Sequence, residues 1–430
     1  MDATLLNRFD RLAVWPYPRR VLAVIGSAYF FGFFDVVNVG DALPAIKHHF
    51  HIGTETASLA ITLGLFGYVI GAVLDAWISD RVGRRQALFG SVAMFSIGTL
   101  LSGLAPTFAW LVVGRVITGM GIGAEIAAVG AYLSEIAPAH LRGKASGQSV
   151  LWGYSAFAVV PFISLALVPN FVDGWRWLFY IGAAGGLAIL PLRRHLPDSP
   201  RWLLANGRDE EARQAVEAAE RFVEKMPARE HPVVVAPTST AAMRPFGVSV
   251  ALLLITWFCY YMANYGWVTL APTLLVDHGF SLKGSLAFLC ISGIGYVAGS
   301  AASIVFADRG SRRWSIGGSL VFASLGFAAI GAWPHGVIIT VSGFLLSASV
   351  GLAIPMLYTY TAEQFHDTVR ARGVAISNGF GHFGGAVAPM IILPVAAWSF
   401  FAGFLVMGGM CLVTAGLVAL GPNATRQTID

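Results

Sequence analysis

Long apolar segments, separated from one another by short polar loops, run through almost the whole chain of 430 residues. The hydrophobic fraction is 56% and the charged fraction only 12%, against the roughly 25% charged residues of an average soluble domain. A membrane-spanning helix uses about 20 residues, and the core of an ordinary soluble domain could not hide so much apolar surface. The pattern predicts an all-α membrane protein with twelve spans, at residues 21–46, 57–78, 86–104, 108–132, 147–169, 176–192, 246–271, 284–306, 315–333, 337–360, 374–395 and 397–420.

The basic residues lie mostly on one side of the predicted spans. With a cytoplasmic N-terminus, the outer loops hold Lys47, Arg176 and Lys283, and Arg115 lies inside a span, which leaves 24 of the 28 Lys and Arg residues on the cytoplasmic side. Because positively charged loops stay in the cytoplasm during insertion, both termini are expected there, in the plasma or inner membrane of the cell. Topology then accounts for the net charge of +5, and no nucleic-acid partner is expected.

The sequence repeats itself once. A shift of 228 residues aligns nine polar or helix-breaking positions with identical residues, without a gap. The pairs are Pro44/Pro272, Asp80/Asp308, Arg81/Arg309, Arg84/Arg312, Arg85/Arg313, Pro106/Pro334, Tyr132/Tyr360, Glu135/Glu363 and Arg142/Arg370. A parallel repeat predicts two pseudo-symmetric six-helix halves around a central cavity. We expect an N-terminal half at 1–192, a cytoplasmic linker with short helices at 193–244, and a C-terminal half at 245–430.

Two loops of the repeat resemble the signature loop of the major facilitator superfamily of transporters. They read DRVGRR at residues 80–85 and DRGSRR at residues 308–313. The resemblance extends over nearly the whole chain. It implies secondary active transport by alternating access, in which two halves rock around a central substrate site.

Charged residues at the predicted cytoplasmic ends of the helices are expected to act in gating. An Asp at the end of a span accepts hydrogen bonds from neighbouring Arg side chains and from a helix N-terminus of the other half, a contact that latches one state of the transporter. The pairs Glu135/Arg142 and Glu363/Arg370 are expected to form salt bridges between helices. The residues assigned to gating are Asp80, Arg81, Arg84, Arg85, Glu135, Arg142, Asp308, Arg309, Arg312, Arg313, Glu363 and Arg370.

Charged side chains at membrane depth are costly and point to function. Four of them, Asp35, Asp75, Arg115 and Glu125, belong to the N-terminal half. The positions 228 residues further along the chain are uncharged, namely Ala263, Ser303, Gly343 and Ala353. The chemistry of the two halves is therefore expected to differ.

The depths of two of these residues coincide. The helical rise places Asp35 about 21 Å above the inner end of its span and Arg115 about 10 Å below the outer end of its own span, in a hydrocarbon core of about 30 Å. An Asp and an Arg in contact stabilise each other's charge, and protonation of the Asp releases the Arg. We therefore assign proton coupling to Asp35, Arg115 and Glu125, with a structural pair between Glu125 and a loop Arg as the alternative. Asp41 is expected at the outer mouth, in contact with solvent.

Two segments indicate the class of cargo. The stretches FFDVVNVGDALP at 33–44 and YYMANYGWVTLAP at 260–272 resemble the first and seventh helices of organic-acid symporters, except that Asn38 replaces the second acid of the common pattern. Sugar porters carry Gln and Asn clusters in the seventh helix, and this chain has Asn264 and no Gln there. The resemblance implies proton-coupled symport of a small organic acid, with an aromatic acid as one form of it. A sugar or polyol porter is the alternative.

The substrate site is expected to combine an aromatic wall with a polar anchor. Tyr residues offer a ring face and a hydroxyl together, and His382 can pair with a carboxylate or respond to pH. Packing is the alternative role for the aromatic residues, and a hydrogen bond with a backbone carbonyl or with Asn378 is the alternative for His382. The residues assigned to substrate binding are Asn38, Trp152, Tyr260, Tyr261, Asn264, Tyr265, Asn378 and His382.

Other classes of protein lack support in the sequence. A membrane enzyme, the remote alternative, needs a nucleophile, a base and an orienting group at one depth, and no such set or phosphate-binding loop is apparent. Cys259, Cys290 and Cys411 lie in apolar stretches, which excludes a disulfide framework or a Cys metal cluster. No catalytic residue, metal or cofactor is expected, and the expected partners are a small-molecule substrate, protons and the lipid bilayer around a monomer.

Overall fold

The structure, a computed structural model, describes residues 3–226, 245–306 and 311–421. Within these ranges the regular structure is helical and no strand is present. Twelve of the described helices are long and apolar enough to cross a membrane, which confirms the predicted fold class. They are α2 (Arg19–His49), α3 (Thr54–Val82), α4 (Arg84–Gly103), α5 (Phe108–Ile136), α6 (Arg142–Leu167), α7 (Gly174–Arg193), α10 (Phe246–Asp277), α11 (Leu282–Phe306), α12 (Arg312–Ala332), α13 (Gly336–Glu363), α14 (Asp367–Trp398) and α15 (Phe400–Leu420).

Each predicted span overlaps one of these helices, and the largest differences lie at the polar ends. The seventh helix continues to Asp277, six residues beyond its predicted end, and the eleventh begins at Asp367, seven residues before its predicted start. Hydropathy reports only the apolar part of a helix, whereas the backbone hydrogen bonds continue into polar residues at the membrane surface. Side-chain caps fix other ends, as where Thr107 accepts a hydrogen bond from the backbone N–H of Trp110 at the start of α5.

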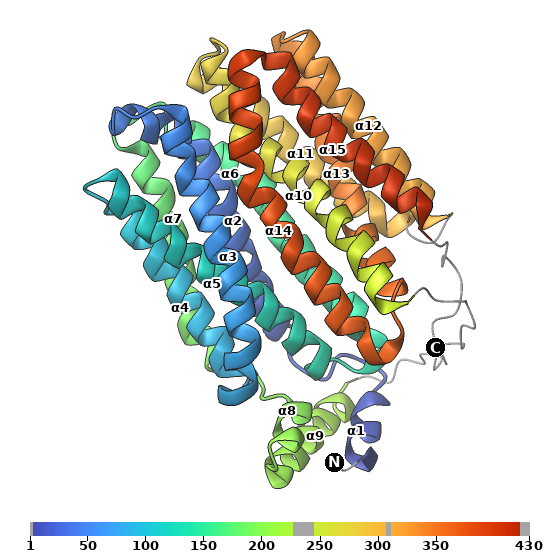
Figure 1. The fold of residues 1–430 in the computed structure, drawn as a ribbon. Coiled ribbons are helices and arrows are strands. Elements are labelled where there is room, and N and C mark those ends of the chain that lie inside the picture. The colour runs from blue at the N-terminus through green and yellow to red at the C-terminus, as the bar shows by residue number, and fades with distance from the viewer. Residues whose placement is uncertain (1–2, 227–244, 307–310, 422–430) are drawn as a thin grey trace.

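The same helix pairs pack in both halves of the bundle. In α2–α7 these pairs are α3 with α5, α4 with α7, and α2 with α6, and in α10–α15 they are α11 with α13, α12 with α15, and α10 with α14. Figure 1 shows the two groups of helices side by side. They meet along α2 with α10, α3 with α14, and α6 with α11. The central site therefore lies between helices of both groups.

Glycines reproduce the repeat as a packing device. At Gly71 an added Cβ would lie 1.9 Å from the carbonyl oxygen of Met120, and at Gly299, which is 228 residues later, it would lie 1.8 Å from that of Ala348. The pairs Gly67/Gly295 and Gly123/Gly351 obey the same shift and meet equivalent carbonyl oxygens. Only Gly permits such an approach between helix backbones. These contacts fix α5 against α3, and thereby place the side chains that α5 carries.

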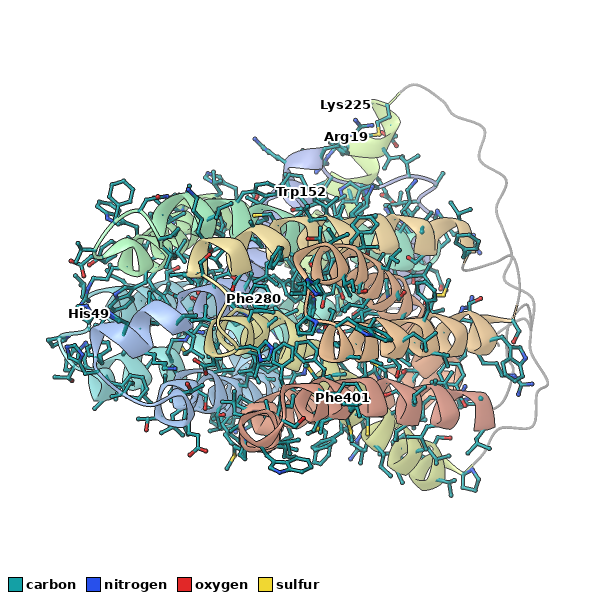
Figure 2. The ribbon with its side chains drawn as sticks, turned by 90° about the horizontal axis from the view of Figure 1, so that it is seen from above. Arg19, His49, Trp152, Lys225, Phe280 and Phe401 are labelled. Carbon is teal, nitrogen blue, oxygen red and sulfur yellow. The ribbon has the colours of Figure 1, made fainter. Side chains whose placement is uncertain are left out.

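Three short helices cover one end of the bundle. They are α1 (Ala3–Asp10), α8 (Pro200–Ala205) and α9 (Asp209–Glu224), the last two within the predicted linker, whose residues 227–244 lie outside the described part of the chain. Phe9 is fully buried in a cluster with apolar residues of α8 and α9. Arg8 donates two hydrogen bonds to the carboxylate of Glu220. We call this end the inner end, following the predicted topology; Figure 2 shows Arg19, where α2 begins, near Lys225 and far from His49, where α2 ends.

Candidate functional site

A buried ion pair joins α2 and α5 at the middle of the N-terminal helices. Nη1 of Arg115 donates a hydrogen bond to Oδ2 of Asp35 over 2.6 Å, and the two residues are 4% and 1% exposed. The hydroxyl of Thr99 donates to Oδ1 of Asp35 over 3.1 Å and lies 3.4 Å from the hydroxyl of Thr118. The carboxylate thus has a cation on one oxygen and a hydroxyl donor on the other. The pair therefore ties α2 to α5 in the interior of the bundle.

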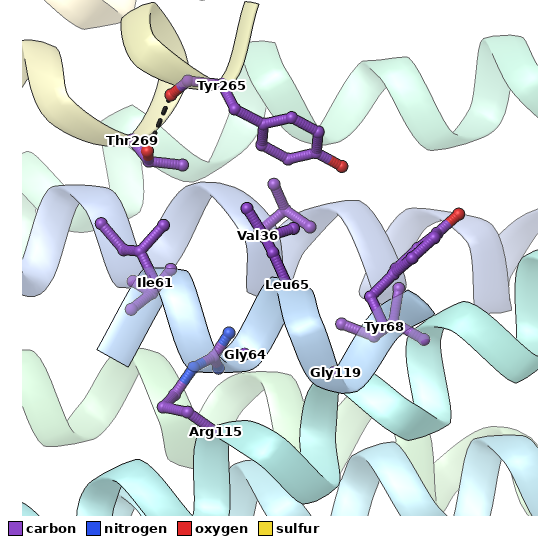
Figure 3. Close-up of a pocket in the computed structure, with 11 residues that line it drawn as sticks. Val36, Ile61, Gly64, Leu65, Tyr68, Arg115, Gly119, Tyr265 and Thr269 are labelled. Atoms are coloured by element: carbon purple, nitrogen blue, oxygen red, sulfur yellow. Dashed lines mark hydrogen bonds between the residues drawn. The ribbon is translucent and has the colours of Figure 1, made fainter. Parts of the chain in front are cut away.

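Arg115 also faces a cavity. The cavity is partly open and is lined by Val36, Val39, Ile61, Gly64, Leu65, Tyr68, Arg115, Gly119, Ile122, Tyr265 and Thr269. Figure 3 shows Tyr265 entering from α10, Tyr68 from α3 and Arg115 from α5. Nε of Arg115 is buried without a hydrogen-bond partner among the described residues. The guanidinium therefore binds Asp35 and also borders a cavity whose other lining residues are mainly apolar.

His382 of α14 lies between aromatic rings from both halves. Its ring stacks on Tyr68 with centroids 4.1 Å apart, and on the other side the ring of Tyr261 is also 4.1 Å away. Tyr265 is 5.9 Å away. Nδ1 lies 3.0 Å from the backbone oxygen of Asn378, the alternative partner considered above. The imidazole thus has a backbone contact and a place in the aromatic wall at once.

Of the remaining residues assigned to substrate binding, Asn378 lies near His382. The Asn378 side chain donates to the hydroxyl of Tyr261 over 2.9 Å, and that hydroxyl lies 3.4 Å from the hydroxyl of Tyr358. Asn38 is fully buried on α2, with neither amide atom hydrogen-bonded within the described residues. Tyr261 and Asn378 thus connect α10 with α14, and Asn38 lies on α2, which packs against α10.

Three residues assigned to the site turn away from the cavity, and for these the placement differs from the expectation. Tyr260 donates to the backbone oxygen of Val350, and Asn264 accepts from Tyr296, so both are engaged within the C-terminal helices. Trp152 is 48% exposed and packs on Gly26, and the described ring contacts do not connect it with the tyrosines. Helical periodicity explains this, because neighbouring residues of one helix face different directions.

Glu125 has a structural partner. It accepts a short hydrogen bond from Nη2 of Arg193, and a second one from the hydroxyl of Ser91 over 2.6 Å. Glu125 and Arg193 are 1% and 0% exposed, respectively. Arg193 lies directly after the predicted sixth span, so the geometry corresponds to the pairing alternative. Asp75 is buried near the same inner end of α3.

Asp41 corrects an expectation about the outer mouth. A solvated position is wrong, because Asp41 is 1% exposed on the buried face of α2. Its two carboxyl oxygens have no hydrogen-bond partner among the described residues. Hydropathy alone could not show this, because α10 and α6 cover the outer part of α2.

Three histidines at the end of α2 and just after it lie at the surface. His48, His49 and His51 are exposed, and His49 lies 3.9 Å from Asp173. The described residues contain no group of three or more metal-ligating side chains that could hold an ion.

The inner-end charges pair within each half. Arg84 contacts Asp80 at 2.7 Å and Glu135 at 2.9 Å, and in the repeated position Arg312 contacts Glu363. The expected pairing of Glu135 with Arg142 is wrong, because Glu135 bonds to Arg84. A short turn of 3₁₀-helix, Ala139–Leu141, separates the ends of α5 and α6.

Further contacts of the assigned gating residues join them to other elements at the inner end. Arg142 reaches Asp10 of α1 at 3.4 Å, where burial and the nearby Arg201 lower the pKa of its guanidinium. Arg85 contacts Asp198, and the guanidinium of Arg81 lies over the ring of Trp77. Arg313 donates to the backbone oxygen of Gly421, and Arg370 donates to that of Ala362. Asp308 and Arg309 lie outside the described residues.

A tie between the halves occurs at the outer end. Nζ of Lys47 lies 2.6 Å from Oδ1 of Asp277, and the hydroxyl of Thr54 donates to Oδ2 over 2.8 Å. Sequence reasoning missed this contact, and it missed Tyr68, although Tyr68 and Tyr296 obey the 228-residue shift. The shift could have pointed to Tyr68. For Lys47 and Asp277 the sequence held no indication of a contact beyond their position in the outer loops.

Comparisons with known proteins agree with this architecture. The niacin transporter NiaP of Acinetobacter baylyi is 27% identical over 442 residues, covering 99% of each chain. The benzoate transport protein of the same species is 26% identical over 401 residues, covering 89% of this chain and 84% of that protein. The xylose transporter XylE of Escherichia coli, in a partially occluded inward-open conformation, superimposes with a TM-score of 0.77 at 20% identity, covering 95% of this chain and 99% of its own.

The family assignment rests on the match over most of the chain. The family model described as Major Facilitator Superfamily matches residues 25–389. This region contains nine of the twelve long helices completely, most of α2 and α14, and the buried site described above. The chain is a multi-pass membrane transporter of small metabolites, not an enzyme, and it belongs to the major facilitator superfamily.

Proposed function

We propose that this protein is a proton-coupled symporter of a small organic acid, aromatic in its preferred form, which works by alternating access. The observation that carries the proposal is the buried pair of Asp35 and Arg115 at the wall of the cavity. An ion pair at membrane depth can be kept only while both charges are compensated. The pair therefore supplies a reason why a proton and an anion would bind together.

The coupling follows from the charge balance around Arg115. A proton that binds to Asp35 removes the negative partner and leaves the guanidinium uncompensated in a low-dielectric site. Loss of one partner of a buried pair costs about 3–5 kcal/mol. A carboxylate substrate in the cavity restores the balance by accepting hydrogen bonds from the guanidinium. Proton and substrate thus favour each other's binding, and the empty carrier returns with the ion pair closed.

The walls of the cavity favour a small planar acid over a polyol. Four lining side chains are polar, namely Arg115, Tyr68, Tyr265 and Thr269, and the Thr269 hydroxyl already donates to the backbone oxygen of Tyr265. A sugar would bring several hydroxyl groups that need partners, and unpaired buried polar groups are costly. The rings of Tyr68 and Tyr265 line the cavity and offer flat surfaces for an aromatic substrate, and His382 stacks behind Tyr68. The similarity to niacin and benzoate transporters supports this class, since both compounds are small aromatic carboxylic acids.

The remaining assignments complete the proposal. Glu125, held by Arg193 and Ser91, is a second acid of the N-terminal helices through which a proton could be passed inward. The pairs Arg84–Glu135 and Arg312–Glu363 are related by the repeat, and we assign to them the holding of the inner helix ends during rocking. We further propose that both termini lie in the cytoplasm and that the protein works as a monomer in the cell membrane.

Uptake into proteoliposomes tests the coupling. Vesicles that hold the protein are given labelled nicotinate, benzoate, glucuronate or xylose, with and without an inward proton gradient. We expect uphill uptake of an aromatic acid with the gradient, loss of uphill uptake in Asp35→Asn, and retained exchange in that variant. Asp173→Asn, which alters an exposed outer-loop acid, is the matched control. Full gradient-driven accumulation by Asp35→Asn would refute the coupling role, and accumulation of xylose alone would favour a sugar porter.

A further inference from the structure

A second carboxyl group lies buried on α2 without the partners that Asp35 has. Asp41 is 1% exposed, and neither of its oxygens is hydrogen-bonded within the described residues. It follows Asp35 by six residues, about 9 Å further toward the outer end along the helix axis. Asp35 has a guanidinium and a hydroxyl donor, whereas Asp41 has neither. The two acids of one helix therefore face different environments.

The side chains nearest to Asp41 are uncharged. On α6, Ser164 is close enough to interact with the carboxyl group, yet its hydroxyl forms no hydrogen bond in this geometry. Cys290 of α11 is a further neighbour. At the preceding residue, Gly40, an added Cβ would lie 2.6 Å from Cα of Thr269, so α2 and α10 are in close contact there. The carboxyl group is enclosed by helices of both halves.

The cations of the surrounding helices are engaged elsewhere. Arg115 of α5 pairs with Asp35, Lys47 of α2 pairs with Asp277 of α10, and Arg176 of α7 donates to backbone oxygens of Gly103 and Ala105. The other titratable groups in the outer part of these elements are exposed or uncharged at neutral pH, namely His48, His49, Glu55, Tyr154, Tyr265, His278 and Lys283. The described ion pairs include none with Asp41 within 4.0 Å.

An ionised carboxylate in such a place would be buried without a compensating charge or donor, which is strongly unfavourable. The neutral acid avoids this cost. We propose that Asp41 is a second proton-binding site, loaded from the outer side, and that its proton is required for the outer ends of the two halves to close. When the outer side opens, Asp41 meets solvent and ionises, and closure then waits for a proton.

This site extends the proposed symport but does not depend on it. When Asp35 loses its proton, it gains the ion pair with Arg115. When Asp41 binds a proton, the only effect is that its carboxyl group can be buried. The outer tie between Lys47 and Asp277 closes over the same region of α2 and α10. Acid on the outer side is therefore expected to favour the closed outer end, even in a variant that cannot couple substrate to protons.

Distances between spin labels test the site without a substrate. Thr56→Cys on α3 and Lys283→Cys on α11 place labels on the exposed outer ends of the two halves, and the native cysteines are buried. The labelled protein in lipid nanodiscs is measured by pulsed electron resonance over a pH series. We expect the ratio of closed to open outer ends to fall by up to about tenfold per pH unit as the pH rises. In Asp41→Asn, a neutral isostere, the closed form is expected to persist at all pH values.

Controls separate this site from other titrating groups. Asp277→Asn should favour the open form throughout while keeping the pH dependence, and Asp35→Asn should keep it as well. Infrared spectra of the same samples should show a protonated carboxylic acid band that Asp41→Asn removes and Asp41→Glu shifts. An unchanged pH dependence in Asp41→Asn, or an unchanged carboxylic acid band, overturns the proposal. Failure of proton-driven uptake in proteoliposomes would instead refute the symport and leave these measurements valid.

Discussion

Replacing Arg115 by Met gives the sharpest energetic test of the buried pair. The variant removes the cation that lies 2.6 Å from Oδ2 of Asp35 and keeps a side chain of similar length. At an effective dielectric constant of about 20, unit charges at this distance attract by about 6 kcal/mol, and breaking a buried pair typically costs about 3–5 kcal/mol. In the variant, Asp35 can avoid this cost by binding a proton and becoming neutral.

Because Asp35 can be protonated, the loss of stability in the variant depends on pH. An Asp in the unfolded chain ionises near pH 4, so keeping the folded carboxyl group neutral costs about 1.4 kcal/mol for each pH unit above that. The folded variant binds a proton that the unfolded chain has lost, and stability therefore falls as pH rises. We expect the free energy of unfolding of Arg115→Met to be lower than that of the parent protein by about 1–2 kcal/mol at pH 5 and by about 4 kcal/mol at pH 7. At pH 7 this loss equals the cost of leaving the charge of Asp35 unpaired.

Equilibrium unfolding with SDS in mixed micelles measures these free energies. Asp35→Asn leaves Arg115 unpaired and should lose a similar amount at neutral pH, but without the pH slope. The double variant Asp35→Asn/Arg115→Met has no uncompensated charge and should regain most of the loss. Equal stability of Arg115→Met and the parent protein at pH 5 and 7, or losses that simply add in the double variant, would refute the reasoning.

Three further predictions concern substrate, gate and packing. His382→Ala should weaken binding of a labelled aromatic acid by about 2–10-fold, because one aromatic contact contributes about 0.5–1.5 kcal/mol. His382→Phe should retain most of the affinity. If the Ala variant bound the acid as tightly as the parent protein, His382 would not belong to the site. Lys47→Ala should make labels at the outer ends separate more often, measured as above, and an unchanged distance distribution would contradict the outer tie. Gly299→Val should lower the free energy of unfolding by about 1–3 kcal/mol or more in the same SDS titration, because its Cβ would meet the carbonyl oxygen of Ala348. Gly318 faces open space, so Gly318→Ala should change the free energy of unfolding about as little as an ordinary surface substitution.

The sequence carries the fold because hydropathy and the repeat are both strong signals. Apolar runs of about 20 residues leave few alternatives to spanning helices. The contact of Asp35 with Arg115 could be anticipated because two charges at one depth in the membrane need each other. In each case the information is local to one helix or follows from the rise per residue.

The residues that sequence reasoning missed or misplaced depend on packing between elements. Tyr68 stacks on His382 only because α3 meets α14 across the two halves. Glu135 was assigned to Arg142, yet the 3₁₀ turn after α5 redirects the chain and Arg84 takes that place. Trp152 shares a helix with Tyr154 but faces Gly26. None of these choices can be read from spacing within one segment.

The repeat also shows what the two halves do not share. Glycine contacts such as Gly71 on Met120 and Gly299 on Ala348 are the same in both, so the frames are equivalent. At the position equivalent to Arg115, however, Gly343 is covered by the indole of Trp267. We infer that the N-terminal half carries the charge chemistry and the C-terminal half the aromatic recognition.

The two chemistries meet where the halves meet. The ring of His382 belongs to the C-terminal half and stacks on Tyr68, which lines the same cavity as Arg115. A substrate that binds Arg115 through its carboxylate and the aromatic wall through its ring would therefore contact both halves at once. Arg115 and Tyr68 come from the N-terminal half, whereas Tyr265 and His382 come from the C-terminal half, so the substrate gains its full affinity only when the halves enclose it. Under this division of roles, binding energy itself favours the occluded state through which the carrier must pass.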